Sequence, residues 1–358
     1  KITFMDLNII IDYLIISIIA SMAINSAMRS LAKKRKILID LPDRSRKFHN
    51  RATPLTGGLA ILIASVLSAE LYLDFNGLKG YVPEFTYHLT IASIILVPLF
   101  LIDDFKSIKP TIRIVFQILL SLYMILMTDI KLENLGNIFY FGDIHLGVLS
   151  IPFTIFCTVG LMNAFNMIDG INGLCSGTAM IALLLIGFKS GLIYDSMLVL
   201  IIGAMIGFLL FNLRIFGKKR GVFLGDHGSN LIGFWVAWAA IYSSQSTVYK
   251  LEPMTMIWFV SIPLLDCIGL IISRVGKGKS WSTPGRDHIH HKLMHKFSSE
   301  VTLLIILLIT LICGFFAIYI ENNFPIWIST LLFILFAIFY YMYAYNYELR
   351  QRLKIKNV

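Results

Sequence analysis

Charged residues are scarce in this sequence. Only 15% of its 358 residues are Asp, Glu, Lys or Arg, whereas 57% are hydrophobic, and the mean hydropathy is +0.77. A soluble chain of this length would form about two domains, but so little charge is not typical of a protein surrounded by water. The composition therefore indicates that a lipid bilayer surrounds most of the chain.

Cysteine is rare as well, and its spacing argues against two kinds of site. Cys157, Cys175, Cys267 and Cys313 are scattered in or beside apolar runs, without any CxxC pair. We therefore expect neither a metal site nor a disulfide framework from them, and interpret them as small buried hydrophobic residues. Low-complexity segments are absent, and the first apolar run is too long for a cleavable signal peptide.

Long apolar runs make up most of what is present. Each is close to the length that a helix needs to cross the hydrocarbon core. They predict an all-α fold: a polytopic integral membrane protein with about eleven transmembrane helices, forming a single domain over residues 1–358. The runs lie near residues 6–28, 56–75, 88–102, 111–128, 147–163, 174–188, 192–212, 228–243, 254–273, 301–320 and 325–346.

The basic residues are unevenly distributed between the loops of this arrangement. If the C-terminus is cytoplasmic, 25 of the 31 Lys and Arg residues fall in cytoplasmic loops and 5 on the opposite side. This is a strong positive-inside signal, and it places every polar motif described below on the cytoplasmic face. The net charge of +10 therefore reflects topology and anionic phosphate ligands, and we expect no nucleic-acid partner.

The most distinctive polar stretch is NAFNMIDGING, residues 163–173. Asn163, Asn166, Asp169 and Asn172 recur every three residues, so they stay on one side of a helical or near-helical turn. Carboxylate and amide oxygens suit a hard cation such as Mg²⁺, and they also suit the donors of a nucleotide base and ribose. The alternative is a polar loop that only caps the neighbouring helices.

Two acidic motifs lie at the ends of other apolar runs. Asp103 and Asp104, followed by Lys106, close the third run, where adjacent acids are costly unless they face water, a cation or a partner. They are candidates for a metal ligand or a general base, or an interfacial stop signal. Asp226 stands in GDHGS before the eighth run, where flanking glycines allow backbone to approach a ligand. This position favours a metal ligand, with a helix N-cap as the alternative.

A histidine-rich loop lies over residues 274–300. It carries Arg286, His288, His290 and His291, whose spacing fits neither HExxH nor a Cys/His zinc motif. We expect this loop to grip a diphosphate through Arg286 and imidazole donors. The alternative is a solvated charged loop.

Two more features have open interpretations. The first cytoplasmic loop offers Arg46 and His49 as anion donors, or as a tether to anionic lipid headgroups. Asp266 lies inside the ninth run, where an acid is a functional candidate by default and a buried structural pairing is an equal alternative. Together, acids for Mg²⁺, basic loops for phosphates and a membrane that presents a lipid acceptor describe phosphoryl transfer.

These motifs resemble those of the polyprenyl-phosphate N-acetylhexosamine-1-phosphate transferases, and of their WecA-like branch in particular. The matching blocks occur in the family's order, and the layout of spans covers nearly the whole chain. The blocks are RKFHNRATPLTGG, LIDDFKS, NAFNMIDGINGL, VFLGDHGSNLIGF and RDHIHHKLMH.

The resemblance implies a reaction in a bacterial inner membrane, with the active site facing the cytoplasm. N-acetylhexosamine-1-phosphate, most simply GlcNAc-1-phosphate, moves from a UDP-sugar to undecaprenyl phosphate, releasing UMP and starting a lipid-linked surface glycan. The implied cofactor is Mg²⁺, with Mn²⁺ as an alternative; membrane lipids and a homodimer partner are further expectations. The His-Ile-His-His pattern departs from the three-histidine run of the peptidoglycan branch, which argues against a muramoyl-pentapeptide donor.

The resemblance also implies roles for single residues. Asp103 and Asp104 match an acidic pair, one of them a candidate base, and Asp169 is a third catalytic candidate. Asp226 matches the Mg²⁺ ligand, with Asn166 beside it. The residues implied in substrate binding are Asn163, Asn172, Lys106, Arg286, His288, His290, His291, Arg46 and His49.

Other functions stay open on the sequence alone. The same reaction with another UDP-N-acetylated sugar fits equally well, and one displacement is not distinguished from a route through a phosphorylated aspartate. A transporter for a lipid-linked sugar also needs many spans and an anion-binding cavity. A transporter, however, more often carries polar residues near the middle of the membrane, whereas these gather at one face.

Overall fold

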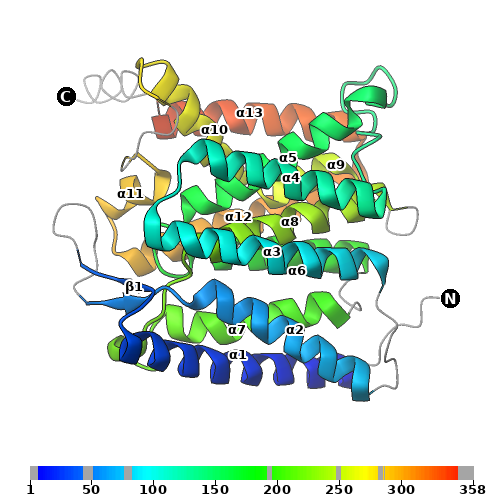
Figure 1. The fold of residues 1–358 in the computed structure, drawn as a ribbon. Coiled ribbons are helices and arrows are strands. Elements are labelled where there is room, and N and C mark those ends of the chain that lie inside the picture. The colour runs from blue at the N-terminus through cyan, green and yellow to red at the C-terminus, as the bar shows by residue number, and fades with distance from the viewer. Residues whose placement is uncertain are drawn as a thin grey trace, which may run out of the picture.

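The computed structural model describes residues 7–42, 51–75, 83–191, 196–246, 251–280, 285 and 287–345. Most of them belong to helices that run side by side along one direction (Figure 1). The helices are α1 (Leu7–Arg35), α2 (Gly57–Phe75), α3 (Glu84–Lys106), α4 (Pro110–Thr128), α5 (Ser150–Ile168), α6 (Leu174–Ser190), α7 (Ser196–Asn212), α8 (Asp226–Gln245), α9 (Pro253–Phe259), α10 (Ser261–Val275), α11 (Ile289–Met294), α12 (Ser299–Asn323) and α13 (Ile326–Tyr345).

The predicted helical, polytopic class is confirmed. Each apolar run forms one helix, except that the ninth run forms the pair α9–α10, which bends by 81°. Among the described residues, six helices are long and apolar enough to cross a membrane, and a seventh span is added if α9–α10 counts as one. Several other apolar helices, including α6, are shorter. The count of eleven spans therefore stays a prediction.

Helix α8 lies at the centre of the bundle and packs against α5. Nearly all of α8 is buried, with Phe234 and Trp238 fully enclosed, as expected of a helix that is apolar on every side. Gly233 allows α8 to approach α5 closely, because a Cβ there would lie 2.8 Å from Met162 Cα. By contrast, α12 and α13 expose large hydrophobic side chains such as Phe339, which suits a lipid-facing perimeter.

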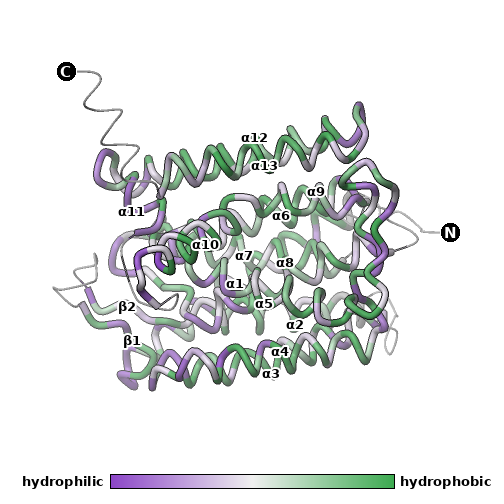
Figure 2. Tube along the Cα trace, turned by 90° about the horizontal axis from the view of Figure 1, so that it is seen from above, coloured by the Kyte–Doolittle hydropathy of each residue, from purple (hydrophilic) through white to green (hydrophobic). Residues whose placement is uncertain are grey.

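A short strand pair, which the sequence did not predict, lies at one end of the bundle. Strands β1 (Ile39–Asp40) and β2 (Thr53–Pro54) pair antiparallel. The chain after β2 docks onto the segment before α8, where the Gly58 N–H donates to Leu224 O at 3.0 Å. A Cβ at Gly58 would lie 2.2 Å from Gly228 Cα, so this contact requires glycine. Hydrophilic segments gather at this end, beside α11 (Figure 2).

Candidate functional site

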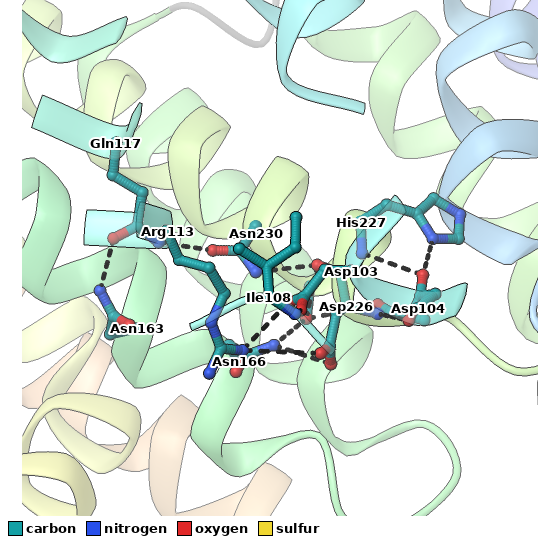
Figure 3. A network of polar contacts seen from close by, with 12 residues as sticks. Asp103, Asp104, Ile108, Arg113, Gln117, Asn163, Asn166, Asp226, His227 and Asn230 are labelled. Atoms are coloured by element: carbon teal, nitrogen blue, oxygen red, sulfur yellow. Dashed lines mark hydrogen bonds and ion pairs between the residues drawn. The ribbon is translucent and has the colours of Figure 1, made fainter. Parts of the chain in front are cut away.

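Three helix ends bring the predicted acidic motifs together at the β1–β2 end of the bundle. Asp103 and Asp104 come from the last turn of α3, Asn166 from the last turn of α5, and Asp226 from the first residue of α8. Figure 3 shows their side chains converging on one network of hydrogen bonds and ion pairs. The sequence placed these residues on one face, and the fold brings them into contact.

Asp104 binds the N-terminus of α8. Its Oδ1 accepts the Asp226 N–H at 2.9 Å, and its Oδ2 accepts the His227 N–H at 3.4 Å. The same Oδ2 lies 2.5 Å from His227 Nδ1. The first N–H groups of a helix lack partners within the helix and attract negative charge. A carboxylate that is only 5% exposed therefore fixes how α3 meets α8.

Asp103, also in the last turn of α3, is bound by other partners. It accepts the Ile108 N–H and forms a 3.1 Å salt bridge with Arg113, from the first turn of α4. Arg113 also lies 3.8 Å from Asp226 Oδ2. Within the described part of the chain, Arg113 is the one Lys or Arg side chain that forms salt bridges with this cluster. A single guanidinium therefore serves two carboxylates.

Asp226 is the most accessible member of the network. Its side chain is 45% exposed, and its Oδ1 accepts the Asn166 amide at 3.1 Å. That amide also donates to Ser229 Oγ at 2.9 Å. Asn166 thus presents its nitrogen to Asp226 and orients the carboxylate; direct metal ligation by Asn166 would use its oxygen and stays a prediction.

A chain of amides fixes the other side of α8. Asn163 Nδ2 donates to Gln117 Oε1 at 2.8 Å, and Gln117 Nε2 donates to Asn230 Oδ1 at 2.7 Å. Asn230 in turn donates to the Asp226 carbonyl at 2.8 Å. Asn163 therefore supports the backbone that carries Asp226, since buried amides are stable only when they are paired.

Asp169 follows α5 and stays open to solvent. The neighbouring protein partly desolvates the carboxyl group, and the charges of Asp226 and Asp104 disfavour a further negative charge beside them. Both effects raise the pKa of the Asp169 carboxyl to about 8. When Asp169 is ionised, it therefore adds to the negative charge of the cluster, which a bound cation would neutralise.

The donor set suits a magnesium ion bound in part by substrate. Among the described residues, no group of three His, Cys, Asp or Glu side chains forms a ready-made metal centre. Mg²⁺ is usually held by only one or two carboxylates, together with waters and substrate phosphates. The accessible Asp226 and Asp169 carboxylates, with an excess of negative charge around them, meet that requirement.

The histidine segment packs against the NAFNMIDGING stretch. His288 and His290 are buried on α11 or at its start, and the ring centroids of His290 and His291 lie 4.1 Å apart. A Cβ at Gly170 would lie 2.0 Å from His290 Nε2, so only glycine allows this contact. Burial, followed by His291 and His288, lowers the pKa of His290 to about 3, so its ring is neutral.

Other predicted residues are placed less closely or not at all. Lys106 is exposed at the end of α3, and Asn172 lies in the turn between α5 and α6. Arg46, His49 and Arg286 lie outside the described residues.

The sequence interpretation missed several members of the network, namely Arg113, Gln117, His227 and Asn230. A signal was available for two of them. Arg113 and Gln117 are polar residues four apart in an otherwise apolar run, so they share one helix face.

Comparison with known proteins places this geometry in a family. A model described as glycosyl transferase family 4 matches residues 86–244, which contain the acidic cluster. The chain is 32% identical over 323 residues to the undecaprenyl-phosphate alpha-N-acetylglucosaminyl 1-phosphate transferase of Escherichia coli K12, covering 88% of this chain and 85% of the relative.

Proteins of the same description from other bacteria are similarly related. The one from Salmonella typhi is 32% identical, covering 88% of this chain and 86% of its own length. The one from Haemophilus influenzae is also 32% identical, covering 86% of each chain. The chain therefore belongs to glycosyl transferase family 4, the polyprenyl-phosphate N-acetylhexosamine-1-phosphate transferases, and is a membrane phosphoglycosyl transferase.

Proposed function

We propose that this enzyme transfers N-acetylglucosamine-1-phosphate from UDP-N-acetylglucosamine to undecaprenyl phosphate, releasing UMP. The observation that carries the proposal is the cluster of Asp103, Asp104, Asp169 and Asp226, with Arg113 as its salt-bridging cation. Phosphoryl transfer between two anions requires concentrated positive charge between them. The names of the relatives support this donor and acceptor.

The reaction calls for Mg²⁺, which we propose is held by Asp226 with Asp169 close by. When bound, the ion supplies the positive charge that offsets the donor diphosphate and the lipid phosphate. Asn166 holds one oxygen of the Asp226 carboxylate by a hydrogen bond and so fixes its orientation. Mn²⁺ is the expected substitute, because it also prefers oxygen ligands.

The reaction proceeds in one displacement. Both oxygens of Asp103 and both of Asp104 accept hydrogen bonds from the protein, and the two side chains are only 3% and 5% exposed, which favours a structural role over attack on phosphorus. The lipid phosphate oxygen therefore attacks the β-phosphorus of the donor directly, and UMP leaves. Asp169 is the proposed base, because its carboxyl is exposed and its raised pKa suits proton transfer near neutral pH.

The histidine segment closes the donor side of the site. The contact between His290 and Gly170 sets α11 beside Asp169. We propose that His288, His290 and His291 face the diphosphate and the sugar, together with Arg286. We further propose that Asn172 and Lys106 contact the nucleotide, and that Arg46 and His49, which lie outside the described residues, bind the lipid phosphate.

The proposed orientation puts the site at the cytoplasmic face of a bacterial inner membrane. The unequal distribution of Lys and Arg between loops supports this topology. We propose that α2, α6, α7 and α8 also cross the membrane; together with the six longer helices and the bent α9–α10 pair they would make eleven spans. The soluble nucleotide sugar then arrives from the cytoplasm and the acceptor from the bilayer.

Release of UMP tests the proposal. Purified enzyme in detergent is supplied with undecaprenyl phosphate, Mg²⁺ and each member of a panel of UDP-sugars, and UMP is measured. We expect UMP with UDP-N-acetylglucosamine, and none when undecaprenyl phosphate or Mg²⁺ is omitted. Turnover with a different UDP-N-acetylated sugar alone would replace the donor, and no UMP with any donor would refute the function.

A further inference from the structure

We propose that Asp266 is a positioning residue for the histidine segment, holding His288 by Nδ1 so that Nε2 is the ring nitrogen left to accept a hydrogen bond from a hydroxyl or amide group of the donor sugar. This inference rests on the proposed function, because it concerns how the segment meets a UDP-sugar. Asp266 lies in α10 and takes no part in the transfer described above. In the sequence analysis, a functional role and a buried structural pairing were equal alternatives for this acid.

Donors surround the Asp266 carboxylate, which is 1% exposed. His288 Nδ1 lies 2.7 Å from Oδ2, and the Ile289 N–H donates to Oδ1 at 2.9 Å. The Tyr340 hydroxyl donates to Oδ1 at 3.2 Å, and the Tyr345 hydroxyl donates to the same oxygen. Oδ1 thus accepts from three donors, which stabilises an ionised carboxylate, so we assign Oδ2 as the acceptor of the bond from His288 Nδ1.

This arrangement fixes the His288 ring. Because a carboxylate cannot donate, Nδ1 must carry the hydrogen that it shares with Asp266. The His288 side chain is 10% exposed, and Nε2 is the nitrogen that is not committed to Asp266. An acid that binds one nitrogen of a histidine commonly sets how the other nitrogen meets its ligand.

The His288 ring is connected to the acidic cluster through its neighbour. Its ring stacks on that of His290, with centroids 5.4 Å apart and planes within 17°. His290 Nε2 lies over Gly170, next to Asp169. A change in the tilt of His288 would therefore move groups beside the proposed base.

The end of α13 holds the segment a second time. Lys292 Nζ donates to the Ala344 carbonyl at 2.6 Å and lies 3.7 Å from the centre of the Tyr345 ring. Tyr345 thus contacts both Asp266 and the side chain of Lys292. These contacts tie α11 to α13, so that Asp266 acts on a segment that is also held by the side chain of Lys292.

A double-mutant cycle distinguishes positioning from packing. Asp266→Asn keeps the shape of the side chain but removes its charge. His288→Asn retains a donor near the position of Nδ1 but lacks Nε2. We expect each change to lower kcat/KM for UDP-N-acetylglucosamine by about 10–100-fold, with KM for undecaprenyl phosphate within about twofold. The double variant should be no worse than His288→Asn, because contacting residues that act together are not additive.

Two outcomes would overturn the inference. Losses that multiply in the double variant would show that Asp266 acts independently of His288. An unchanged kcat/KM in Asp266→Asn, with only a lower melting temperature, would show a packing role. Wild-type enzyme is assayed in parallel, so absence of UMP there counts against the proposed function and not against Asp266.

If the wild-type enzyme releases no UMP, the role of Asp266 can still be tested by a measurement that does not need turnover. Protein labelled with ¹⁵N-histidine is examined by NMR, and the His288 signals are assigned by their loss in His288→Asn. We expect an Nδ1-protonated ring in the wild type and a changed ring state in Asp266→Asn. An identical His288 signal in both proteins would refute the positioning role.

A milder pair of variants guards against misfolding of Asp266→Asn. Tyr345→Phe removes one donor to Asp266. Tyr341→Phe is the matched control, because its ring stacks on Tyr345 while its hydroxyl forms no hydrogen bond within the described part of the chain. We expect about a threefold loss of kcat/KM for the donor in Tyr345→Phe and none in Tyr341→Phe. Equal values in the two variants would contradict the inference.

Discussion

Two groups of polar residues lie near each other in this enzyme, one around the buried acid Asp266 and the other around the several acids of the Asp226 cluster, and they balance their charge in opposite ways. Asp266 receives donors on both oxygens from a histidine, a backbone amide and two tyrosines. The cluster around Asp226 combines several carboxylates with the single guanidinium of Arg113. The first group is complete without a ligand, whereas the second has an excess of negative charge.

The difference explains how one site can combine rigidity with cation binding. A carboxylate whose donors are all supplied by the protein fixes the groups around it. Carboxylates that repel one another raise each other's pKa until a cation arrives. The two groups meet where His290 packs on Gly170, so the fixed part of the site presents its histidines directly to the part that needs a metal.

We call the acids around Asp226, which have an excess of negative charge, the incomplete group. Removing one of its charges should have the largest effect. Asp226→Asn preserves the shape of the side chain and its contact with Asn166, but it removes an accessible carboxylate that we propose as the metal ligand. We expect kcat to fall by about 10²–10³-fold, because metal-based charge stabilisation contributes several kcal/mol. UMP release gives the rate, and thermal unfolding checks the fold. Ordinary turnover at ordinary Mg²⁺ would disprove the metal assignment.

Many of the residues in these two groups were predicted from the sequence, and there is a physical reason why their partners were not. Apolar runs gave the helices, and Asn166 and Asp226 were predicted to be neighbours, as they are at 3.1 Å. Periodicity says which face of a helix a residue occupies, but not which helix lies opposite. Arg113 and His227 were therefore missed as partners of the acids.

The same limit applies to other parts of the fold. The pairing of β1 with β2 depends on docking against the segment before α8, and strands of two residues leave no periodic pattern. Asp266 was recognised as unusual, but its partners Tyr340 and Tyr345 lie 74 and 79 positions away. Tyrosines at the end of an apolar run resemble ordinary interfacial residues.

Removing the cation of the incomplete group tests its charge balance. In Arg113→Ala, Asp103 and Asp226 lose their common guanidinium. We expect activity to fall by about 10–100-fold because Asp103 is no longer oriented. The Mg²⁺ concentration for half-maximal activity should decrease, since the site becomes more negative. Arg113→Lys, which keeps the charge, is the control, and an increased Mg²⁺ requirement would contradict this charge balance.

The pH response should separate the metal-free and metal-loaded states. The pKa of Asp169 is raised from 3.8 to about 8, so folding favours the neutral carboxyl, and its contribution to stability is lost as pH rises from the unfolded value toward the folded one. Without divalent cations, the melting temperature should therefore decrease from about pH 5 to about pH 8, less so in Asp169→Asn. Added Mg²⁺ lowers the pKa by offsetting Asp226 and Asp104, and should shift the acidic limb of the rate profile to lower pH. If the acidic limb of the pH–rate profile did not move with Mg²⁺ at constant ionic strength, Asp169 would not be the titrating group beside the metal.

A smaller effect is expected at the contact between the two groups. In Gly170→Ala, the new methyl group would lie 2.0 Å from His290 Nε2, so α11 must shift away from the acidic cluster. Gly160→Ala is the matched control, because a Cβ at Gly160, in α5, meets nothing within 4 Å. We expect kcat/KM for the UDP-sugar to fall by about tenfold in Gly170→Ala, as a misplacement of about 1 Å is costly, and to stay near wild type in Gly160→Ala. If the two variants behaved alike, the histidines would not depend on this contact, and the rigid and metal-binding parts of the site would act separately.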